Sequence, residues 1–354
     1  MTGTGGVSRG GEEGVRFQPA EMRRLSQSIL EAVGTPEDLA SIVAASLVDA
    51  NLAGHDSHGV IRLTSYVAKV RGGQVQPAAR TRIEPLGGAC ARVDGGWGWG
   101  QPAAHLATDT AAELARVNGV GLVTIARCNH IGRLGEYIEK LGRAGQMGFM
   151  TCNSPPAVTP YGGYTRLLGT NPIAWGVPQE PGKPPLVVDF ATATVAEGKL
   201  RLALAAGSKA PPGALVDKEG RPSEETAAFY GGGALTTFGG HKGYGLSVMA
   251  EVMGGILSGT GASSVPGYNN GNGTMVFAID VRRFVPMADF MEQVEAFSAR
   301  LRAAPRAPGF DEILMPGEPE WRSRLQRAEA GIPVPAATHR AIADLAAGLG
   351  LGVI

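Results

Sequence analysis

The chain has 354 residues and a formal charge of zero, because 32 Lys and Arg balance 32 Asp and Glu. This balance, without a basic run, lacks the charge pattern typical of nucleic-acid binding, so no nucleic-acid partner is expected. No apolar run is long enough to span a membrane, so no membrane partner is expected either. The three cysteines form no C-x-x-C pair, which disfavours a disulfide scaffold or a structural zinc and favours a reducing, cytoplasmic setting.

The N-terminal part of the chain is predicted to begin with a leader and two helices. Residues 1–16 are Gly-rich and polar, so we expect a disordered leader. Helices are predicted over 21–33 and 36–52. The second begins at Thr35-Pro36-Glu37-Asp38, which combines a hydroxyl cap, a proline at the first position and acids in the first turn.

From about residue 80, short β-branched runs alternate with amphipathic stretches, which indicates an α/β core. The expected strands cover 120–126, 147–152, 186–189 and 274–281. The expected helices cover 132–144, 193–205, 243–257, 287–303 and 339–349. Residues 211–233 are rich in Gly, Pro and Ser, which is typical of a surface excursion. The terminal helices are expected to pack together as a second region.

A polar segment at 55–59 leads into another predicted helix, over 60–71. If that helix starts at Ser57 or His58, a polar stripe places His58, Arg62 and Tyr66 one turn apart. An Arg fork prefers a carboxylate, and a His one turn away could exchange a proton beside it. The same spacing also fits the solvated face of a capped helix. The histidines of the segment lack a third ligand, so no metal is expected.

His130 follows the predicted strand 120–126, and ligands collect at the carboxyl ends of strands in open parallel sheets. A simple helix cap remains the alternative. His241 and Lys242 open the apolar helix near 243. A cation with free N–H groups there suits a phosphate, although a solvated lysine fits equally. The Gly-rich run at 95–100 does not match G-x-G-x-x-G, so an ordinary Rossmann domain is not expected.

Five segments together resemble the malate/L-lactate dehydrogenase family, which is not Rossmann-based. They are Gly54-His55-Asp56-Ser57-His58-Gly59, Asn129-His130-Ile131-Gly132-Arg133-Leu134-Gly135, Leu168-Gly169-Thr170-Asn171-Pro172, Val188-Asp189-Phe190-Ala191-Thr192 and His241-Lys242-Gly243-Tyr244-Gly245. The resemblance extends over residues 17–354. The first two segments look most like the hydroxycarboxylate dehydrogenase B branch.

The resemblance implies a three-layer α/β/α fold of the sulfolactate dehydrogenase type, with NAD or NADP as cofactor and a homodimer as assembly. It divides the chain into a helical substrate and dimer region, residues 17–79 with 285–354, and a nucleotide-binding α/β domain, residues 80–284. Both are expectations about this chain.

The same resemblance assigns site residues. Either His58 or His130 exchanges the substrate proton, with Ser57 orienting His58. The residues implied to bind substrate are Arg62, Tyr66 and Thr170. The residues implied to contact the cofactor are His130, Ile131, Gly132, Asp189, Phe190, Ala191, Thr192, Ala193, His241, Lys242, Glu329 and Gly331.

The sequence therefore predicts an NAD(P)-dependent oxidoreductase that interconverts a 2-hydroxycarboxylate and its 2-oxo acid, with a histidine whose pKa is ordinary, ~6.5. Reduction of a cyclic imino acid, pyrroline- or piperideine-2-carboxylate, is the alternative. Lys199 disfavours it, because imino-acid reductases tend to carry an acid there. A nucleotide-binding protein without turnover is a third reading, which the proton-transfer group beside a carboxylate clamp argues against.

Overall fold

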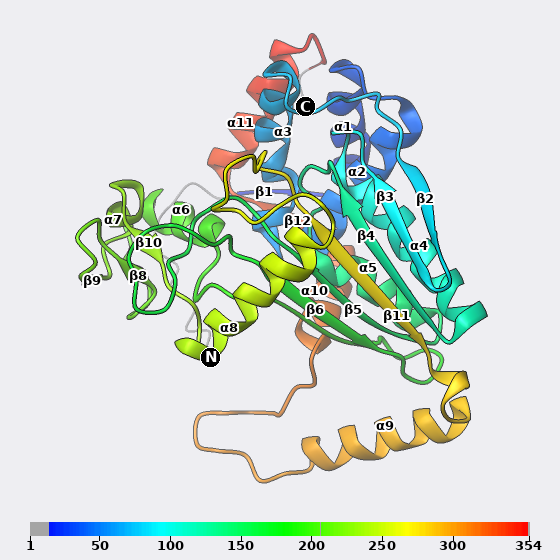
Figure 1. The fold of residues 1–354 in the computed structure, drawn as a ribbon. Coiled ribbons are helices and arrows are strands. Elements are labelled where there is room, and N and C mark those ends of the chain that lie inside the picture. The colour runs from blue at the N-terminus through cyan, green and yellow to red at the C-terminus, as the bar shows by residue number, and fades with distance from the viewer. Residues whose placement is uncertain (1–13, 206, 353–354) are drawn as a thin grey trace.

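The computed structural model describes residues 14–205 and 207–352 (Figure 1). The expected leader therefore lies outside the described residues as far as residue 13. Its last two residues are ordered, since Val15 and Arg16 belong to strand β1 (Val15–Phe17). This strand pairs antiparallel with β12 (Ile332–Val334), which ties the two ends of the chain together.

A seven-stranded sheet forms the centre of the molecule (Figure 1). Its order is β2 (Arg82–Gly87), β3 (Cys90–Asp94), β4 (Val120–Ala126), β11 (Thr274–Asp280), β5 (Gln146–Cys152), β6 (Pro172–Val177) and β7 (Leu186–Ala191). Among these strands only β3 and β4 pair in parallel. The parallel sheet assumed in placing His130 is therefore wrong, because β11 runs between β4 and β5 in the opposite direction.

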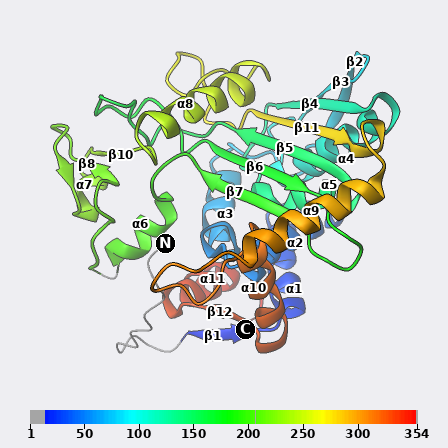
Figure 2. The same ribbon diagram turned by 90° about the horizontal axis from the view of Figure 1, so that it is seen from below.

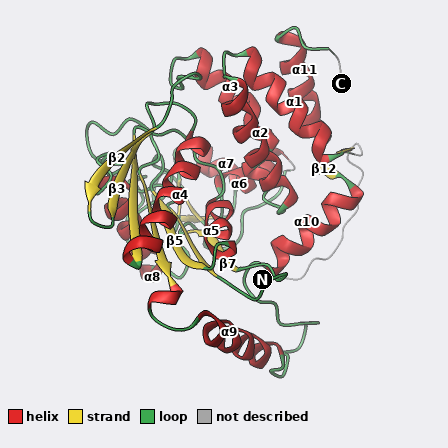
Figure 3. Ribbon diagram, turned by 90° about the vertical axis from the view of Figure 1, so that its right-hand side faces the viewer, coloured by secondary structure: helices red, strands yellow, loops and turns green. Residues whose placement is uncertain are grey.

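Helices cover both faces of this sheet, which confirms the three-layer α/β/α expectation (Figures 1 and 3). On one face α4 (Gly100–Asn118) packs on β4 and β11, and α5 (Leu134–Arg143) packs on β5 and β6. On the other face lies α8 (His241–Ala250), which continues through a π-helical turn at Glu251–Ile256. The long apolar helix expected at 243–257 is thus present, with a widened turn in its second half.

A second hydrophobic core lies beside the sheet, where both ends of the chain meet (Figure 3). It contains α1 (Pro19–Ala32), α2 (Glu37–Leu52), α3 (Leu63–Arg71) and α11 (Ala336–Gly348). Helix α10 (Glu318–Ala330) runs against α2. Helix α9 (Met287–Arg302) takes no part in that core and projects from the far end of the sheet (Figures 1 and 3). The expected two-domain division stays a prediction.

The expected surface excursion is part of a small lobe (Figure 2). The lobe contains α6 (Glu197–Ala205), α7 (Thr226–Tyr230), β8 (Leu215–Val216), β9 (Pro222–Ser223) and β10 (Ala234–Leu235). Leu200, Leu215 and Phe229 give it a hydrophobic core of its own. Across the described ranges, no helix combines the length and apolar character that crossing a bilayer requires.

Candidate active site

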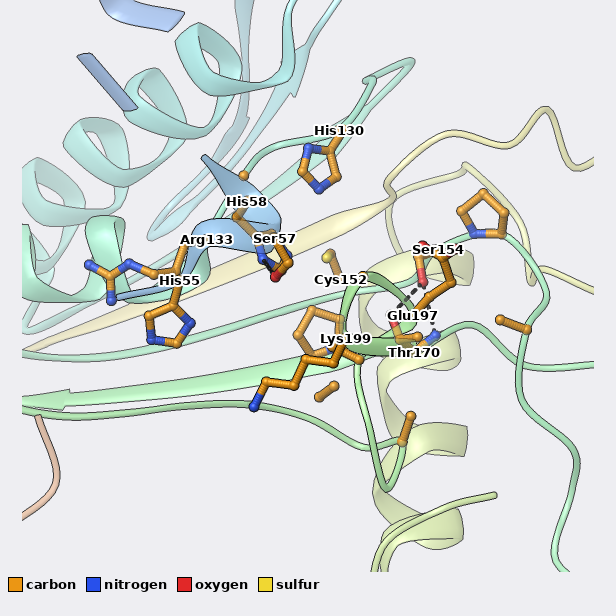
Figure 4. Close-up of a pocket in the computed structure, with 18 of the residues that line it drawn as sticks. His55, Ser57, His58, His130, Arg133, Cys152, Ser154, Thr170, Glu197 and Lys199 are labelled. Atoms are coloured by element: carbon orange, nitrogen blue, oxygen red, sulfur yellow. Dashed lines mark hydrogen bonds between the residues drawn. The ribbon is translucent and has the colours of Figure 1, made fainter. Parts of the chain in front are cut away.

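A cleft of about 1040 Å³ lies between α3, the loop after β4, the end of β7 and the α6 lobe (Figure 4). Small-molecule sites usually occupy ~300–1,000 Å³, so this cleft lies at the upper end of that range. The expected site residues on its wall are Ser57, His58, Arg62, Tyr66, His130, Ile131, Gly132, Thr170, Asp189, Phe190, Ala191 and Ala193.

Five further expected residues lie off this wall. Thr192 is buried beside it and donates to the Thr170 carbonyl from its backbone N–H, at 2.9 Å, and from Oγ1, at 3.1 Å. His241 and Lys242 are exposed at the start of α8, and Glu329 is exposed at the end of α10. Gly331 is buried next to β12. The structure does not bring the last four to the cleft wall, and their cofactor role stays a prediction.

The segment that carries His58 is kinked, so the single helical stripe considered from the sequence is wrong. Two short 3₁₀ turns, at Asp56–His58 and Val60–Arg62, precede α3. Gly59 separates them, and a Cβ there would lie 2.1 Å from Oδ1 of Asn51. That same Oδ1 accepts the Val60 N–H at 2.9 Å. Helix α2 therefore holds the kink, and the kink still turns both His58 and Arg62 into the cleft.

Arg62 and Ser57 surround His58. The Nε of Arg62 donates to the Ser57 carbonyl at 2.7 Å, and its Nη groups make no hydrogen bond within residues 14–205 and 207–352. The Oγ of Ser57 lies 3.0 Å from Nδ1 of His58. Burial, with the nearby Arg62 charge, lowers the pKa of His58 to about 3. The ordinary imidazole pKa expected from the sequence is therefore wrong, and His58 is neutral at pH 7.

A buried hydrogen-bond chain ends on His130. The Nε2 of Gln101 donates to the Tyr66 hydroxyl oxygen at 2.8 Å, and that oxygen lies 2.7 Å from Nδ1 of His130. Gln101 and Tyr66 are buried, at 0% and 4% exposed. In the arrangement in which the phenol donates its proton to Nδ1, the neutral imidazole carries its own proton on Nε2.

The loop that carries His130 packs against the Gly-rich run at residues 95–100. A Cβ on Gly100 would lie 2.3 Å from the His130 carbonyl oxygen, so only glycine lets α4 begin against this backbone. The side chain of Asn129 donates to the carbonyls of Trp97 at 2.9 Å and Gly98 at 3.0 Å. The run at 95–100, which failed as a nucleotide fingerprint, thus has a packing role under the histidine.

An ionic network supports the Asp189 side of the cleft. Asp189 accepts the Gly135 N–H at 2.7 Å, and burial raises the pKa of its carboxyl group. Arg133 lies beside it, 3% exposed, and donates to Glu139 at 2.9 Å. Nε and Nη1 of Arg133 have no hydrogen-bond partner among the described residues. Arg324 pairs with Glu139 as well, so the network joins α5 to α10.

Thr170 is positioned by the buried carboxylate of Glu251, which binds the residues on either side of it, Gly169 and Asn171. Glu251, 4% exposed, accepts from the side chains of Asn171 at 2.9 Å, Asn153 at 3.0 Å and Ser263 at 2.8 Å. These donors come from three loops that meet behind the cleft. Thr170 itself faces the cleft, with its Oγ1 3.3 Å from the hydroxyl of Ser154 (Figure 4).

Lys69, Gln101 and Arg133 are among the residues of this site that sequence reasoning missed. Lys69 lies on α3, seven residues after Arg62, and both side chains line the cleft, so helical spacing could have found it. Gln101 lies in a helix that the sequence did not predict, and its partner Tyr66 is 35 residues away. Within the described part of the chain, no group of three or more His, Cys, Asp or Glu side chains is arranged to hold a metal ion.

Comparison with known proteins agrees with this fold. The model of the malate/L-lactate dehydrogenase family matches residues 17–343. A malate dehydrogenase of Pyrococcus abyssi is 35% identical over 91% of this chain and 92% of its own length. Hydroxycarboxylate dehydrogenase B of Escherichia coli O157:H7 is 34% identical over 96% of both chains.

Solved structures of related enzymes have the same fold. A putative malate/lactate dehydrogenase from E. coli has a TM-score of 0.89 at 34% identity, with 96% of both chains covered. The δ1-piperideine-2-carboxylate reductase of Pseudomonas syringae pv. tomato has a TM-score of 0.81 at 29% identity, covering 94% of this chain and 99% of that one.

The family model and the relatives, which are hydroxy-acid dehydrogenases, support an oxidoreductase, and dehydrogenases of this family generally imply a nicotinamide cofactor. The chain belongs to the malate/L-lactate dehydrogenase family.

Proposed function

We propose that this protein interconverts a 2-hydroxycarboxylate and its 2-oxo acid with NAD or NADP. The observation that carries the proposal is a guanidinium with free Nη groups, Arg62, in one cleft with two neutral imidazoles, His58 and His130. The rings of the two histidines lie 5.6 Å apart. A carboxylate held by an Arg fork would orient the adjacent C2 oxygen toward these rings.

The walls of the cleft fit a nicotinamide dinucleotide. Phe190, 37% exposed, meets Phe238 edge to face at 5.3 Å, which offers a flat apolar surface for a ring. Asp189 uses Oδ2 for the Gly135 amide, which leaves Oδ1 for a ligand hydroxyl. Residues 131–132 and 189–193 would hold the cofactor. When bound, it supplies the hydride acceptor for oxidation and the hydride donor for reduction.

The two histidines take different roles in this proposal. His130 is a fixed donor, because the chain from Gln101 through Tyr66 keeps its proton on Nε2. His58 exchanges the proton, because the Ser57 hydroxyl has no such constraint and can either accept from Nδ1 or donate to it. With Nδ1–H donating to Ser57, Nε2 of His58 is free to act as a base.

In oxidation, His58 takes the proton of the C2 hydroxyl as the C2–H bond breaks and the carbonyl forms. The Nε2–H of His130 donates to the same oxygen, which stabilises the charge that develops on it. In reduction, protonated His58 returns its proton to that oxygen. Arg62 holds the carboxylate in both directions, so the reacting oxygen stays between the two rings.

A panel of 2-oxo acids tests the function directly. Glyoxylate, pyruvate, phenylpyruvate and oxaloacetate are each offered with NADH and with NADPH, and loss of reduced-cofactor absorbance is followed. We expect at least one 2-oxo acid to be reduced. Absence of turnover with the whole panel would overturn the proposal.

Histidine variants test the division of roles. His58→Gln should lower kcat by ~10²–10⁴, the usual contribution of a proton-transfer group. His130→Gln keeps an N–H donor and should lose less, about tenfold. His339→Gln, which lies outside the cleft near Phe17, serves as the control. Equal losses in the first two variants would contradict the separate roles.

Reduction of a cyclic imino acid is the second candidate. It is supported by the likeness to a solved piperideine-2-carboxylate reductase. Lys199 argues against it, because the resemblance leads one to expect an acid at this position in an imino-acid reductase. Assay of piperideine-2-carboxylate beside the 2-oxo acids separates the two candidates.

We also infer a homodimer in a cytoplasmic setting. Helix α9 and the segments beside it expose large apolar side chains, including Phe284 at 68%, Phe297 at 60% and Phe310 at 55%. An apolar groove of about 440 Å³ lies between α9 and the β6–β7 edge, with Trp175 on its wall. An apolar area of this kind is typical of an interface between subunits. The free cysteines are consistent with a reducing compartment.

A further inference from the structure

Lys69 is a charged group of the cleft that the mechanism above does not use. It lies two turns beyond Arg62 on α3 and, with Ser65 and Tyr66, completes the face of that helix that lines the cleft. It is half-buried, and its ammonium group makes no hydrogen bond or ion pair within the described ranges. Burial, and then the charge of Arg62, lower the pKa of Lys69. Its charge also acts on His130.

The histidine end of the cleft therefore has more positive than negative charge. Two acids line the cleft, and both are engaged elsewhere. Asp189 accepts the Gly135 N–H at 2.7 Å, and Glu197 accepts from Arg201 at 2.9 Å. Lys199, another cation of the cleft wall that makes no ion pair within the part of the chain that the structure describes, extends away from His58 and His130 (Figure 4). A partly desolvated ammonium group without a counter-ion is unfavourable, so a ligand that brings a second negative charge here gains affinity.

We propose that Lys69 binds a second anionic group of the substrate, so that the protein prefers dianionic 2-hydroxy and 2-oxo acids to monoanionic ones. The inference rests on the proposed function, because Arg62 is taken to hold the carboxylate next to C2. Seven residues of helix separate the two backbones by ~10 Å. Both side chains are long and project from the same face, so their charged ends can grip opposite ends of a four-carbon diacid.

A phosphate of the cofactor is the other source of negative charge that could meet Lys69, and the test must separate the two. The probes are malate and 2-hydroxybutyrate, which have four carbons each and differ in the second carboxylate. Each is titrated calorimetrically into the protein saturated with reduced cofactor, so that binding is measured without turnover. Lys69→Met removes the charge and keeps most of the length. Arg71→Met removes an exposed cation of the same helix and is the control.

Wild type and Arg71→Met should bind malate at least tenfold more tightly than 2-hydroxybutyrate, the usual size of a charge-assisted hydrogen bond. Lys69→Met should lose this preference by weakening malate alone, with the affinity for NADH and NADPH unchanged. In Lys69→Met, the ratio of kcat/KM for oxaloacetate to kcat/KM for 2-oxobutyrate should fall as well.

The proposal is overturned if wild type binds both probes equally, or if Lys69→Met keeps the malate preference. It is also overturned if the variant loses affinity for the cofactor while the preference stays, because Lys69 then binds a phosphate. These outcomes are distinct from failure of the proposed function. A protein that reduces no 2-oxo acid, yet binds malate through Lys69, would refute the activity and leave the subsite standing.

Discussion

The hydroxyl of Tyr66 carries the hydrogen-bond chain to His130, so Tyr66→Phe tests the tautomer directly. The substitution removes one hydroxyl and leaves two groups without their partner: Nε2 of Gln101, which is 0% exposed, and Nδ1 of His130. An unsatisfied buried polar group costs ~1–3 kcal/mol, so the free energy of unfolding should fall by about 2–4 kcal/mol. Denaturation in urea measures this loss.

The same variant should lower kcat. Loss of a preorganised donor costs ~10²–10³ in kcat. Tyr66→Phe keeps the ring of His130 in place and frees only its proton to move between Nδ1 and Nε2, so we expect a smaller loss, about tenfold. Nitrogen chemical shifts of His130 should move from the Nε2–H form in wild type toward a mixture of tautomers.

Tyr137→Phe is the matched control, because this buried hydroxyl donates to the Ile131 carbonyl and does not touch His130. It should lose comparable stability with little change in the His130 shifts. Wild-type shifts and kcat in Tyr66→Phe would refute the reasoning, since the chain would then not determine the tautomer.

Three further predictions concern the support, the ionisation and the assembly of the site. Glu251→Gln should lower the free energy of unfolding by about 2–4 kcal/mol, because the buried donors around Glu251 then face an NH₂ group. Denaturation in urea measures the loss, and Glu292→Gln, at an exposed position, should show none. The pKa of His58 is lowered to about 3, so the base form persists as pH falls, and kcat/KM for hydroxy-acid oxidation should stay flat from pH 8 to about 5; an inflection near 6.5 would contradict this. Phe297→Asp should give a monomer by light scattering, while Val117→Asp, at a similarly exposed position on α4, should leave a dimer. A dimer in both variants would place the interface elsewhere.

The elements that the sequence predicted well are those with strong local signals. The range 120–126 matches β4, since it is rich in β-branched and apolar residues. Helix α2 begins close to the predicted start, but the predicted hydroxyl cap is wrong, because Pro36 occupies the cap position and Oγ1 of Thr35 accepts from Nε1 of Trp99 at 3.1 Å. Helix α4 was missed because its buried face is made of alanines, Ala103, Ala107 and Ala111 among them, which give little hydrophobic contrast. Helix α10 was missed because it has no buried residue.

The same distinction between local and long-range signals applies to the candidate site. His58, Arg62 and His130 could be singled out because each is a reactive residue type in a polar segment between apolar ones. How these three residues lie relative to one another could not be predicted, because it depends on contacts between helices far apart in the chain, such as the one between Tyr66 and Gln101. The lowered pKa of His58 is likewise a property of burial and of a neighbouring charge, and no spacing rule contains it.

That lowered pKa has a consequence for the reaction in the reducing direction, where His58 must donate a proton. Burial and the charge of Arg62 disfavour the imidazolium form in the empty cleft. A substrate carboxylate bound to Arg62 offsets that charge, so it raises the pKa of His58 in the complex. Substrate binding thus makes the acid that reduction needs, and a dianion, by also neutralising Lys69, does so more strongly than a monoanion. The pKa seen in kcat for reduction should therefore lie above the one seen in kcat/KM, with the larger separation for oxaloacetate than for 2-oxobutyrate.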